Sequence, residues 1–144
     1  MKPPARSEEG YTLTEMLVVI GIIGLIAAVL TPTVMGQMSR ARAKTARLQM
    51  ETVAASLEMY LADVGRYPTQ EEGMAALVSE PNDAAGWTGP YLRDRKSVND
   101  PWGRPLRYQL DSEGRAFTLI SLGADGKEGG RGAAADIQIP EPAS

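Results

Sequence analysis

The stretch from Glu15 to Leu30 reads EMLVVIGIIGLIAAVL, and it decides the fold of this chain. No residue from Met16 to Leu30 is charged, and the uncharged span continues to Ser39. About 20 apolar residues are enough for a helix to cross a bilayer, so the span predicts a membrane-length helix. Glu15 stands alone at its head. A charge at that place is costly unless a positive group meets it.

The helical pattern continues beyond the uncharged span. Pro32 lies inside the apolar part, where a proline removes a backbone hydrogen bond and favours a kink. Gly65 can cap the C-terminus, and Pro68 prevents continuation. We therefore expect one helix from about Thr12 to Val64, with its first half in lipid and its second half packed on a small domain. Apolar residues at intervals of four and three define the packed face: Ala46, Met50, Val53, Leu57, Tyr60 and Val64.

The rest of the chain predicts short elements. Thr69 and Glu72 have the spacing of a capping box, which opens a short helix to about Ser79. Residues 82–105 form a loop that Trp87, Tyr91 and Trp102 anchor on the helix. A hairpin is expected from strands at 106–110 and 117–122, because apolar residues alternate on either side of an Asp-Ser-Glu-Gly turn. A glycine-rich loop, 123–132, precedes a last strand at 136–139.

These elements predict an α+β fold, in which a long N-terminal helix packs on a small antiparallel sheet. The expected organisation has five parts. Residues 1–10 form a leader, 11–39 the transmembrane helix and 40–64 its amphipathic continuation. Residues 65–140 form the globular part, and 141–144 a tail.

Composition excludes several classes of protein. The 144 residues carry a formal net charge of −3, whereas a nucleic-acid-binding domain is usually basic. The chain has neither cysteine nor histidine, so it cannot build a thiol nucleophile, a Ser-His-Asp triad or a histidine metal site. No nucleophile–base pair is visible, and we expect no enzyme. Any bound metal ion should be one that oxygen ligands hold, such as calcium.

The N-terminal sequence Gly10-Tyr11-Thr12-Leu13-Thr14-Glu15 resembles the processing motif of type IV pilins and their secretion relatives. The resemblance implies that a prepilin peptidase cuts between Gly10 and Tyr11 and then N-methylates Tyr11. It also makes Pro32 the kink-forming proline of the family. The usual first mature residue is Phe, and Tyr11 departs from this.

The physical chemistry of such a cut agrees with the motif. Cleavage leaves a cationic amine on Tyr11, and methylation keeps the charge. If helices pack side by side with an axial offset, that amine can meet Glu15 of a neighbouring subunit. Either charge buried alone would cost roughly 3–5 kcal/mol. Glu15 would therefore select helix register during assembly.

The second half contains five motifs in order: RYPT at 66–69, EGMAAL at 72–77, WTGPYL at 87–92, DPWGRP at 100–105 and SLGADGKEGG at 121–130. With these motifs the chain resembles the major pseudopilin family of type II secretion systems. The resemblance implies a homo-oligomeric helical filament, the pseudopilus, that drives export of folded proteins across the outer membrane. It also implies minor pseudopilins and an inner-membrane assembly platform as partners, and a single-pass inner-membrane protein with a periplasmic C-terminal domain. The positive charges at 40–47 outnumber those of the leader and favour the opposite orientation.

The glycine-rich loop is bracketed by Asp125 and Asp136. From spacing alone, a flexible turn with two solvated acids is favoured over a metal site. The family resemblance implies instead a structural calcium ion, with side-chain ligands from Asp125 and Asp136 and the backbone carbonyl of Leu122. The sequence has alanines at 133–135, where the family often supplies a further ligand. Glu128 is a possible substitute.

Two other functions remain open at this stage. One is a type IV pilus or DNA-uptake pilin, although those often carry a C-terminal disulfide that this chain cannot form. The other is a periplasmic calcium-binding module released from an ordinary secretory signal. That alternative would remove Glu15 from the mature chain.

Overall fold

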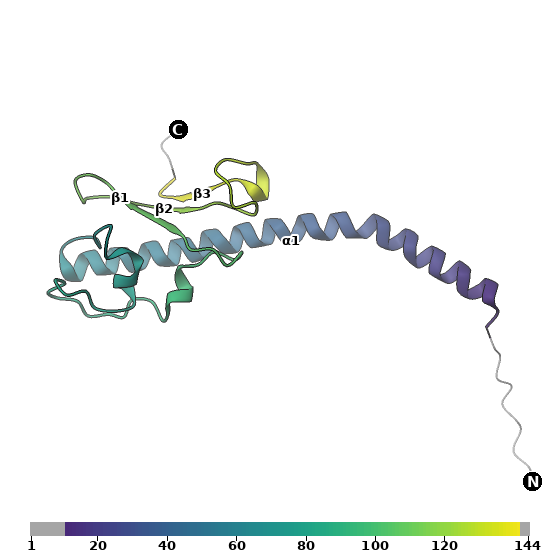
Figure 1. Ribbon diagram of the computed structural model, residues 1–144, viewed down its shortest axis with the longest axis horizontal. Helices are drawn as coiled ribbons and strands as arrows, with labels where there is room; N and C mark the ends of the chain where they lie inside the picture. The colour runs from purple at the N-terminus through teal and green to yellow at the C-terminus, as the bar shows by residue number, and fades with distance from the viewer. Residues whose placement is uncertain (1–10, 142–144) are drawn as a thin grey trace, which may run out of the picture. The chain divides into compact units, whose positions relative to one another are not determined.

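The computed structural model describes residues 11–141. The expected leader, 1–10, with Gly10 and its cleavage site, and the last three residues of the expected tail lie outside the described residues. The chain divides into two compact units, one up to Gln37 and one from Met38 onward. Helix α1, Leu13–Val64, contributes to both (Figure 1).

Helix α1 matches the predicted helix to within one residue at its start. The hydroxyl of Thr12 accepts a hydrogen bond from the backbone N–H of Glu15 at 3.2 Å, which caps the first turn. At the other end, Gly65 adopts a positive φ of 81° and its N–H bonds the Leu61 carbonyl at 2.8 Å. This is the glycine stop that the sequence predicted. Pro32 lies within the helix.

The core of the second unit forms where α1 meets the remainder of the chain. Five of the six predicted face residues are buried, and Val64 is half-buried. Met50, Leu57 and Tyr60 are fully covered. They pack against Leu77, Tyr108, Leu119 and other residues of the later elements. The 3–4 periodicity therefore identified the packing face correctly.

Three short strands form one antiparallel sheet in the order β1-β2-β3. They are β1 Arg107–Leu110, β2 Phe117–Ser121 and β3 Ile137–Ile139. In β2 alternate residues are buried, because one face of the sheet covers the helix. Figure 1 shows the sheet along one side of the C-terminal half of α1. The predicted hairpin and last strand are confirmed, each strand one residue shorter.

The segment between α1 and β1 differs from the prediction. The capping box is present, but the helix that follows is a 3₁₀ helix, Gly73–Leu77, and not a longer helix to Ser79. Gly73, the first residue of this 3₁₀ helix, has a φ of +55°, a left-handed conformation that a glycine adopts without strain. The predicted loop 82–105 contains a second 3₁₀ helix, Arg95–Val98, whose N-terminus Asp94 caps. A third, Gly132–Ala134, follows the glycine-rich loop.

Of the three aromatic residues predicted to anchor the long loop on the helix, Tyr91 contacts α1, Trp87 bonds the first 3₁₀ helix, and Trp102 lies beside Arg104 of its own turn. The indole N–H of Trp87 donates to the Ala76 carbonyl at 2.9 Å. The ring of Tyr91 meets Tyr60 of α1 edge-on, with centroids 5.8 Å apart. Its hydroxyl also donates to Asp63 at 2.8 Å. These contacts give the aromatic residues a structural role.

Candidate functional site

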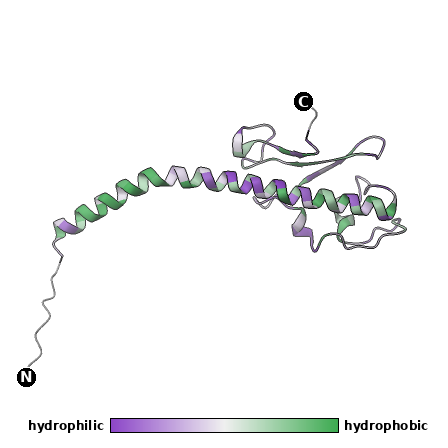
Figure 2. Ribbon diagram, turned by 180° about the vertical axis from the view of Figure 1, so that it is seen from behind, coloured by the Kyte–Doolittle hydropathy of each residue, from purple (hydrophilic) through white to green (hydrophobic). Residues whose placement is uncertain are grey.

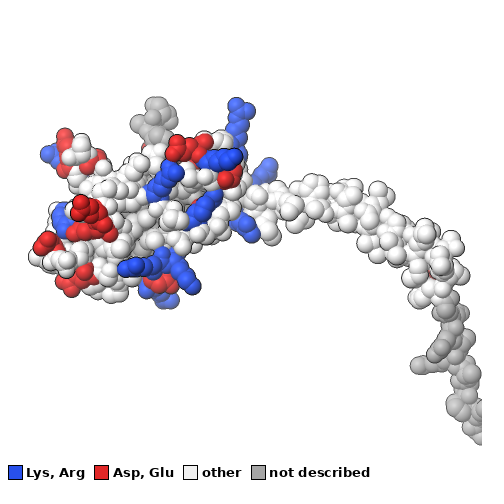
Figure 3. All heavy atoms as spheres, viewed as in Figure 1, with Lys and Arg blue, Asp and Glu red and all other residues white. Residues whose placement is uncertain are grey.

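The first part of α1 presents a long, mainly apolar surface. Every residue from Tyr11 to Met38 is exposed, including the large side chains of Ile20 and Leu25. In Figure 2 most of this stretch is green, the hydrophobic colour, after a purple first turn. Figure 3 shows charged side chains gathered beyond it, over the second unit. The described residues contain one helix with the length and composition to cross a membrane, and this is its apolar part.

Glu15 lies in the first turn of α1. In the described part of the chain its carboxylate takes part in no recorded ion pair or hydrogen bond. Its backbone N–H bonds Thr12, so the Thr-x-x-Glu spacing at 12–15 forms half of a capping box. A carboxylate at a helix N-terminus also interacts favourably with the helix dipole. This local role was not predicted, although the Thr–Glu spacing signalled it.

In the glycine-rich loop, both aspartates accept hydrogen bonds from backbone N–H groups. One oxygen of Asp125 accepts from the N–H of Lys127 at 3.1 Å. One oxygen of Asp136 accepts from the N–H of Gly129 at 2.9 Å, and the Gly129 carbonyl accepts in return from the Asp136 N–H. The Leu122 carbonyl accepts from Gly126. The second oxygen of each carboxylate has no recorded hydrogen bond within residues 11–141.

The remaining candidate calcium ligands are the Glu128 side chain and backbone carbonyls of the loop. Glu128 forms an ion pair with Arg107 at 2.7 Å. Over residues 11–141, no three acidic side chains gather in a metal-binding cluster. The carbonyls of Ala134 and Ala135 converge on Gly123, where the methyl group of an alanine would come within 2.6 Å of the Ala135 oxygen. The loop therefore offers two carboxylates and several carbonyl oxygens.

Arg104 connects this loop to the DPWGR turn. Its guanidinium donates to the Gly123 carbonyl and lies 3.4 Å from the buried carboxylate of Asp100. It also lies 5.6 Å from the centre of the Trp102 ring, within cation–π range. At Gly126 a side chain would collide with this guanidinium. The turn was visible in the sequence as a motif, but this contact was not predicted.

Asp100 holds the same turn together. Its carboxylate accepts from the backbone N–H groups of Trp102 at 3.0 Å and Arg104 at 2.9 Å. Its other oxygen accepts from the hydroxyl of Ser121 at 3.0 Å, at the end of β2. The side chain is 2% exposed. The turn, the sheet and the glycine-rich loop thus meet at one buried carboxylate.

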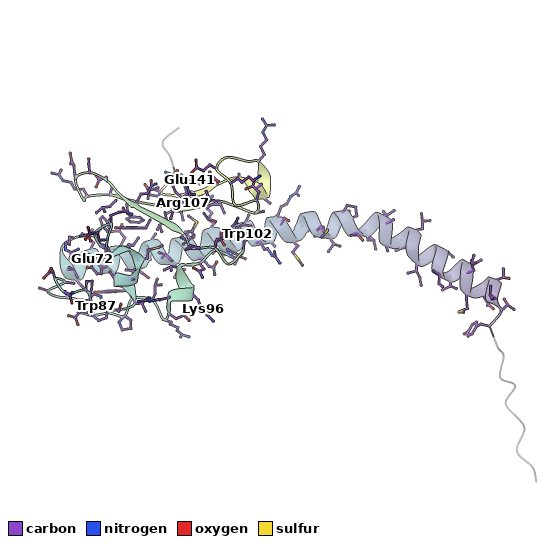
Figure 4. The ribbon with its side chains drawn as sticks, in the orientation of Figure 1. Glu72, Trp87, Lys96, Trp102, Arg107 and Glu141 are labelled. Carbon is purple, nitrogen blue, oxygen red and sulfur yellow. The ribbon has the colours of Figure 1, made fainter. Side chains whose placement is uncertain are left out.

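A second charged cluster lies at the C-terminal end of α1, where Figure 4 labels Glu72 and Trp87. Arg66 donates to both carboxylate oxygens of Glu72, and Thr69 exchanges two hydrogen bonds with the same residue. The bonds from Arg66 and Thr69 lower the pKa of Glu72 to about 2. Glu72 is therefore ionised and held in place. This excludes it as a proton donor near neutral pH.

Comparison with known proteins gives consistent results. Residues 33–139 match the family "Type II secretion system (T2SS), protein G", and residues 5–31 match the prokaryotic N-terminal methylation motif. The chain is 40% identical over 136 residues to a type II secretion system core protein G of Pseudomonas aeruginosa, covering 92% of this chain and 94% of the relative. A protein of the same name from Xanthomonas campestris is 35% identical, covering 94% and 92%.

The fold has a solved counterpart. A crystal structure of the major pseudopilin from the type 2 secretion system of enterohaemorrhagic Escherichia coli aligns with a TM-score of 0.60 and 26% identity. The alignment covers 75% of this chain and 94% of that one.

Proposed function

The chain belongs to the type II secretion system protein G family and is a major pseudopilin, and from this premise we propose how its residues serve assembly. Before assembly, the subunit resides in the inner membrane, where the apolar part of α1 anchors it. It then polymerises into a periplasmic pseudopilus that drives folded proteins across the outer membrane. The exposed apolar surface from Met16 to Met38 carries this proposal, because it suits lipid before assembly and neighbouring helices afterwards.

Processing prepares the N-terminus. The methylation motif matched at residues 5–31 supports cleavage between Gly10 and Tyr11 by a prepilin peptidase, followed by N-methylation of Tyr11. The new amine begins two residues before α1. Its positive charge meets Glu15 of a neighbouring subunit, and the pair fixes the offset between adjacent helices. Pro32, inside α1, leaves the Ala28 carbonyl without its usual helical donor.

Orientation follows from assembly in the periplasm. The second unit lies on the periplasmic side, against the charge count over 40–47, because its partners in the filament are there. Those partners are further copies of the chain, minor pseudopilins and the inner-membrane assembly platform. The subunit has a structural role and catalyses no reaction.

A structural calcium ion in the glycine-rich loop is the second part of the proposal. Asp125 and Asp136 would each supply a carboxylate oxygen, and Leu122 its carbonyl. The fit is supported by the chemistry of the loop, in which each aspartate uses only one carboxylate oxygen for a backbone hydrogen bond, since calcium takes six to eight oxygen ligands from carboxylates and carbonyls. The chain has no cysteine to form a disulfide, so a cation bound by Asp125 and Asp136 would hold the two ends of this loop together. The guanidinium of Arg104 contacts the loop at the Gly123 carbonyl.

The N-terminus of the mature protein tests the proposal. Intact-mass analysis of the chain from secreting cells should show loss of residues 1–10 and one added methyl group. Deleting the gene should abolish secretion by the type II pathway, and supplying it again should restore secretion. A mature chain that begins at Met1, or one cut within or after the apolar span, would refute the proposal. A cut after the span would favour the released calcium-binding module.

A further inference from the structure

The part of α1 that follows the uncharged span carries a cluster of positive charge. The sequence has no acidic residue from Met16 to Met50, but it has four cationic ones shortly before Met50. In Figure 3 basic side chains, drawn in blue, gather where the uncharged part of α1 ends. Like charges this close repel each other unless a negative group lies among them. The four cations, all exposed, are Arg40, Arg42, Lys44 and Arg47.

Of these four, Arg47 has a negative partner in the described part of the chain. It forms ion pairs with Glu51 at 3.7 Å and with Glu141 near the end of the chain. Within residues 11–141 no ion pair is recorded for the other three cations. The cations without a recorded partner are thus the three nearest to the uncharged span. We call them the basic collar.

The position of the basic collar along α1 matches the surface of a bilayer. The uncharged span ends at Ser39 and is longer than the ~20 residues that cross the hydrocarbon. Its end therefore reaches the headgroup layer, where Arg40 follows directly. Lys44 lies about 6 Å further along the helix axis. This distance is shorter than the screening length of about 8 Å at physiological ionic strength, so the whole collar acts on the headgroups.

The arrangement of the collar around the helix favours lipid over a protein partner. Arg40 and Lys44 lie one turn apart on the same side of α1, whereas Arg42 is rotated by about 200° from Arg40. The first buried residue of α1 is Ala46, so the collar precedes the face that packs in the core. A protein surface would contact one side of the helix. A layer of headgroups contacts every exposed side.

We propose that the basic collar binds the headgroups of anionic phospholipids while the subunit is in the membrane. The guanidinium groups of Arg40 and Arg42 can each donate two hydrogen bonds to a phosphate, and Lys44 adds a compact charge. A zwitterionic headgroup carries its own ammonium group, so the collar selects anionic lipids. Each such cation strengthens binding to an anionic surface about fivefold. The inference rests on the membrane anchoring in the proposed function and does not require the filament.

Spin-labelled lipids test this preference. The full-length chain is reconstituted in phosphatidylcholine vesicles that contain a trace of spin-labelled phosphatidylglycerol or spin-labelled phosphatidylcholine. Electron paramagnetic resonance then measures the fraction of each label that is held at the protein surface. At low salt, phosphatidylglycerol should associate about fivefold more strongly. The preference should shrink at about 1 M salt, where the screening length is about 3 Å. Equal association of both labels at low salt would overturn the inference.

A matched pair of double variants assigns the preference to the collar. Arg42→Gln with Lys44→Gln removes two collar cations, and Arg95→Gln with Lys96→Gln removes two exposed cations of the second 3₁₀ helix. The collar variant should lose most of the preference, while the control keeps it. Both should unfold at the parental temperature in detergent, because all four positions are exposed. An equal preference in the two variants would overturn the inference.

Exchange of the two cations tests whether charge is what the lipid recognises. Arg42→Lys with Lys44→Arg keeps both charges and should keep the preference, and its loss would contradict an electrostatic site. The outcomes also separate this inference from the proposed function. Equal association of the two lipids overturns the inference even if the chain supports secretion. Absence of filaments from secreting cells refutes the proposed function even if the lipid preference holds.

Discussion

Arg66 and Glu72 form a two-pronged ion pair, with Nη1–Oε2 at 2.7 Å and Nη2–Oε1 at 2.8 Å. Arg66 follows α1, and Glu72 ends the capping turn before the first 3₁₀ helix. The same guanidinium donates to the Tyr67 and Asp83 carbonyls. This pair therefore fixes the turn by which the chain leaves the long helix.

Replacing Glu72 should destabilise the fold. Glu72→Gln loses the charge-assisted bonds, at a cost of about 1–2 kcal/mol after allowance for solvent screening. Thermal unfolding of the full chain in detergent should show a midpoint several degrees lower. Glu71→Gln, a neighbouring exposed carboxylate, serves as the control and should change little. Equal midpoints for both variants would contradict a structural role for the pair.

The pKa of Glu72 predicts a pH dependence of stability. The carboxylate has a pKa of about 2 in the folded chain and an ordinary value of 4.5. A lowered pKa stabilises the folded state above the unfolded value, and that contribution is lost as the pH falls from about 4.5 to about 2. The free energy of unfolding, measured across this range, should fall more steeply for the parent than for Glu72→Gln. Parallel curves would refute the assignment.

Replacing the buried carboxylate of Asp100 should destabilise the fold more than replacing Glu72. Asp100→Asn weakens its bonds to the turn and leaves Arg104 without its ion-pair partner. We expect a loss of about 2–4 kcal/mol in unfolding free energy. Ser121→Ala removes one of the bonds and should cost about 1 kcal/mol. Denaturant titration of both variants measures their free energies of unfolding. A smaller loss for Asp100→Asn than for Ser121→Ala would show that other contacts hold the turn.

Gln70 protects the open edge of the sheet. Its side-chain amide donates to the Tyr108 carbonyl at 2.8 Å and accepts from the Leu110 N–H at 3.2 Å, as a neighbouring strand would. Gln70→Ala should raise the hydrogen-exchange rate of the Leu110 amide at least tenfold. Gln109→Ala, an exposed substitution within β1, should leave that rate near the parental value. No change in Gln70→Ala would mean that the edge is protected in another way.

The sequence predicted the elements that depend on local periodicity. The face of α1 from Ala46 to Tyr60 and the alternation in β2 follow from spacing, which the sequence displays directly. The 3₁₀ helix that begins at Gly73 was not predicted, because a left-handed glycine there depends on how the turn packs. The link from Asp100 to Ser121 joins residues 21 positions apart. Spacing carries no information about such contacts, even though the DPWGR motif marked one end.

The calcium proposal predicts a stability change on metal removal. The full chain in detergent should unfold at a lower temperature after treatment with a calcium chelator, and added calcium should reverse the loss. At calcium concentrations a hundred times the dissociation constant, the gain is about 2.7 kcal/mol. Asp125→Asn should abolish the response, while Asp111→Asn in the hairpin turn should retain it. Identical midpoints with and without calcium would remove the metal from the proposal.

Glu15 should matter for assembly and not for processing. Glu15→Gln keeps the size of the side chain and removes its charge, so the amine of Tyr11 on a neighbouring subunit loses its partner. Because an unpaired buried charge costs roughly 3–5 kcal/mol, filament yield and secretion should fall sharply. The mature N-terminus should still form, as intact mass would show. Thr12→Ala removes the helix cap but leaves both charges, and should assemble. If Thr12→Ala fails as badly as Glu15→Gln, then capping of α1, and not the charge pair, is what assembly requires.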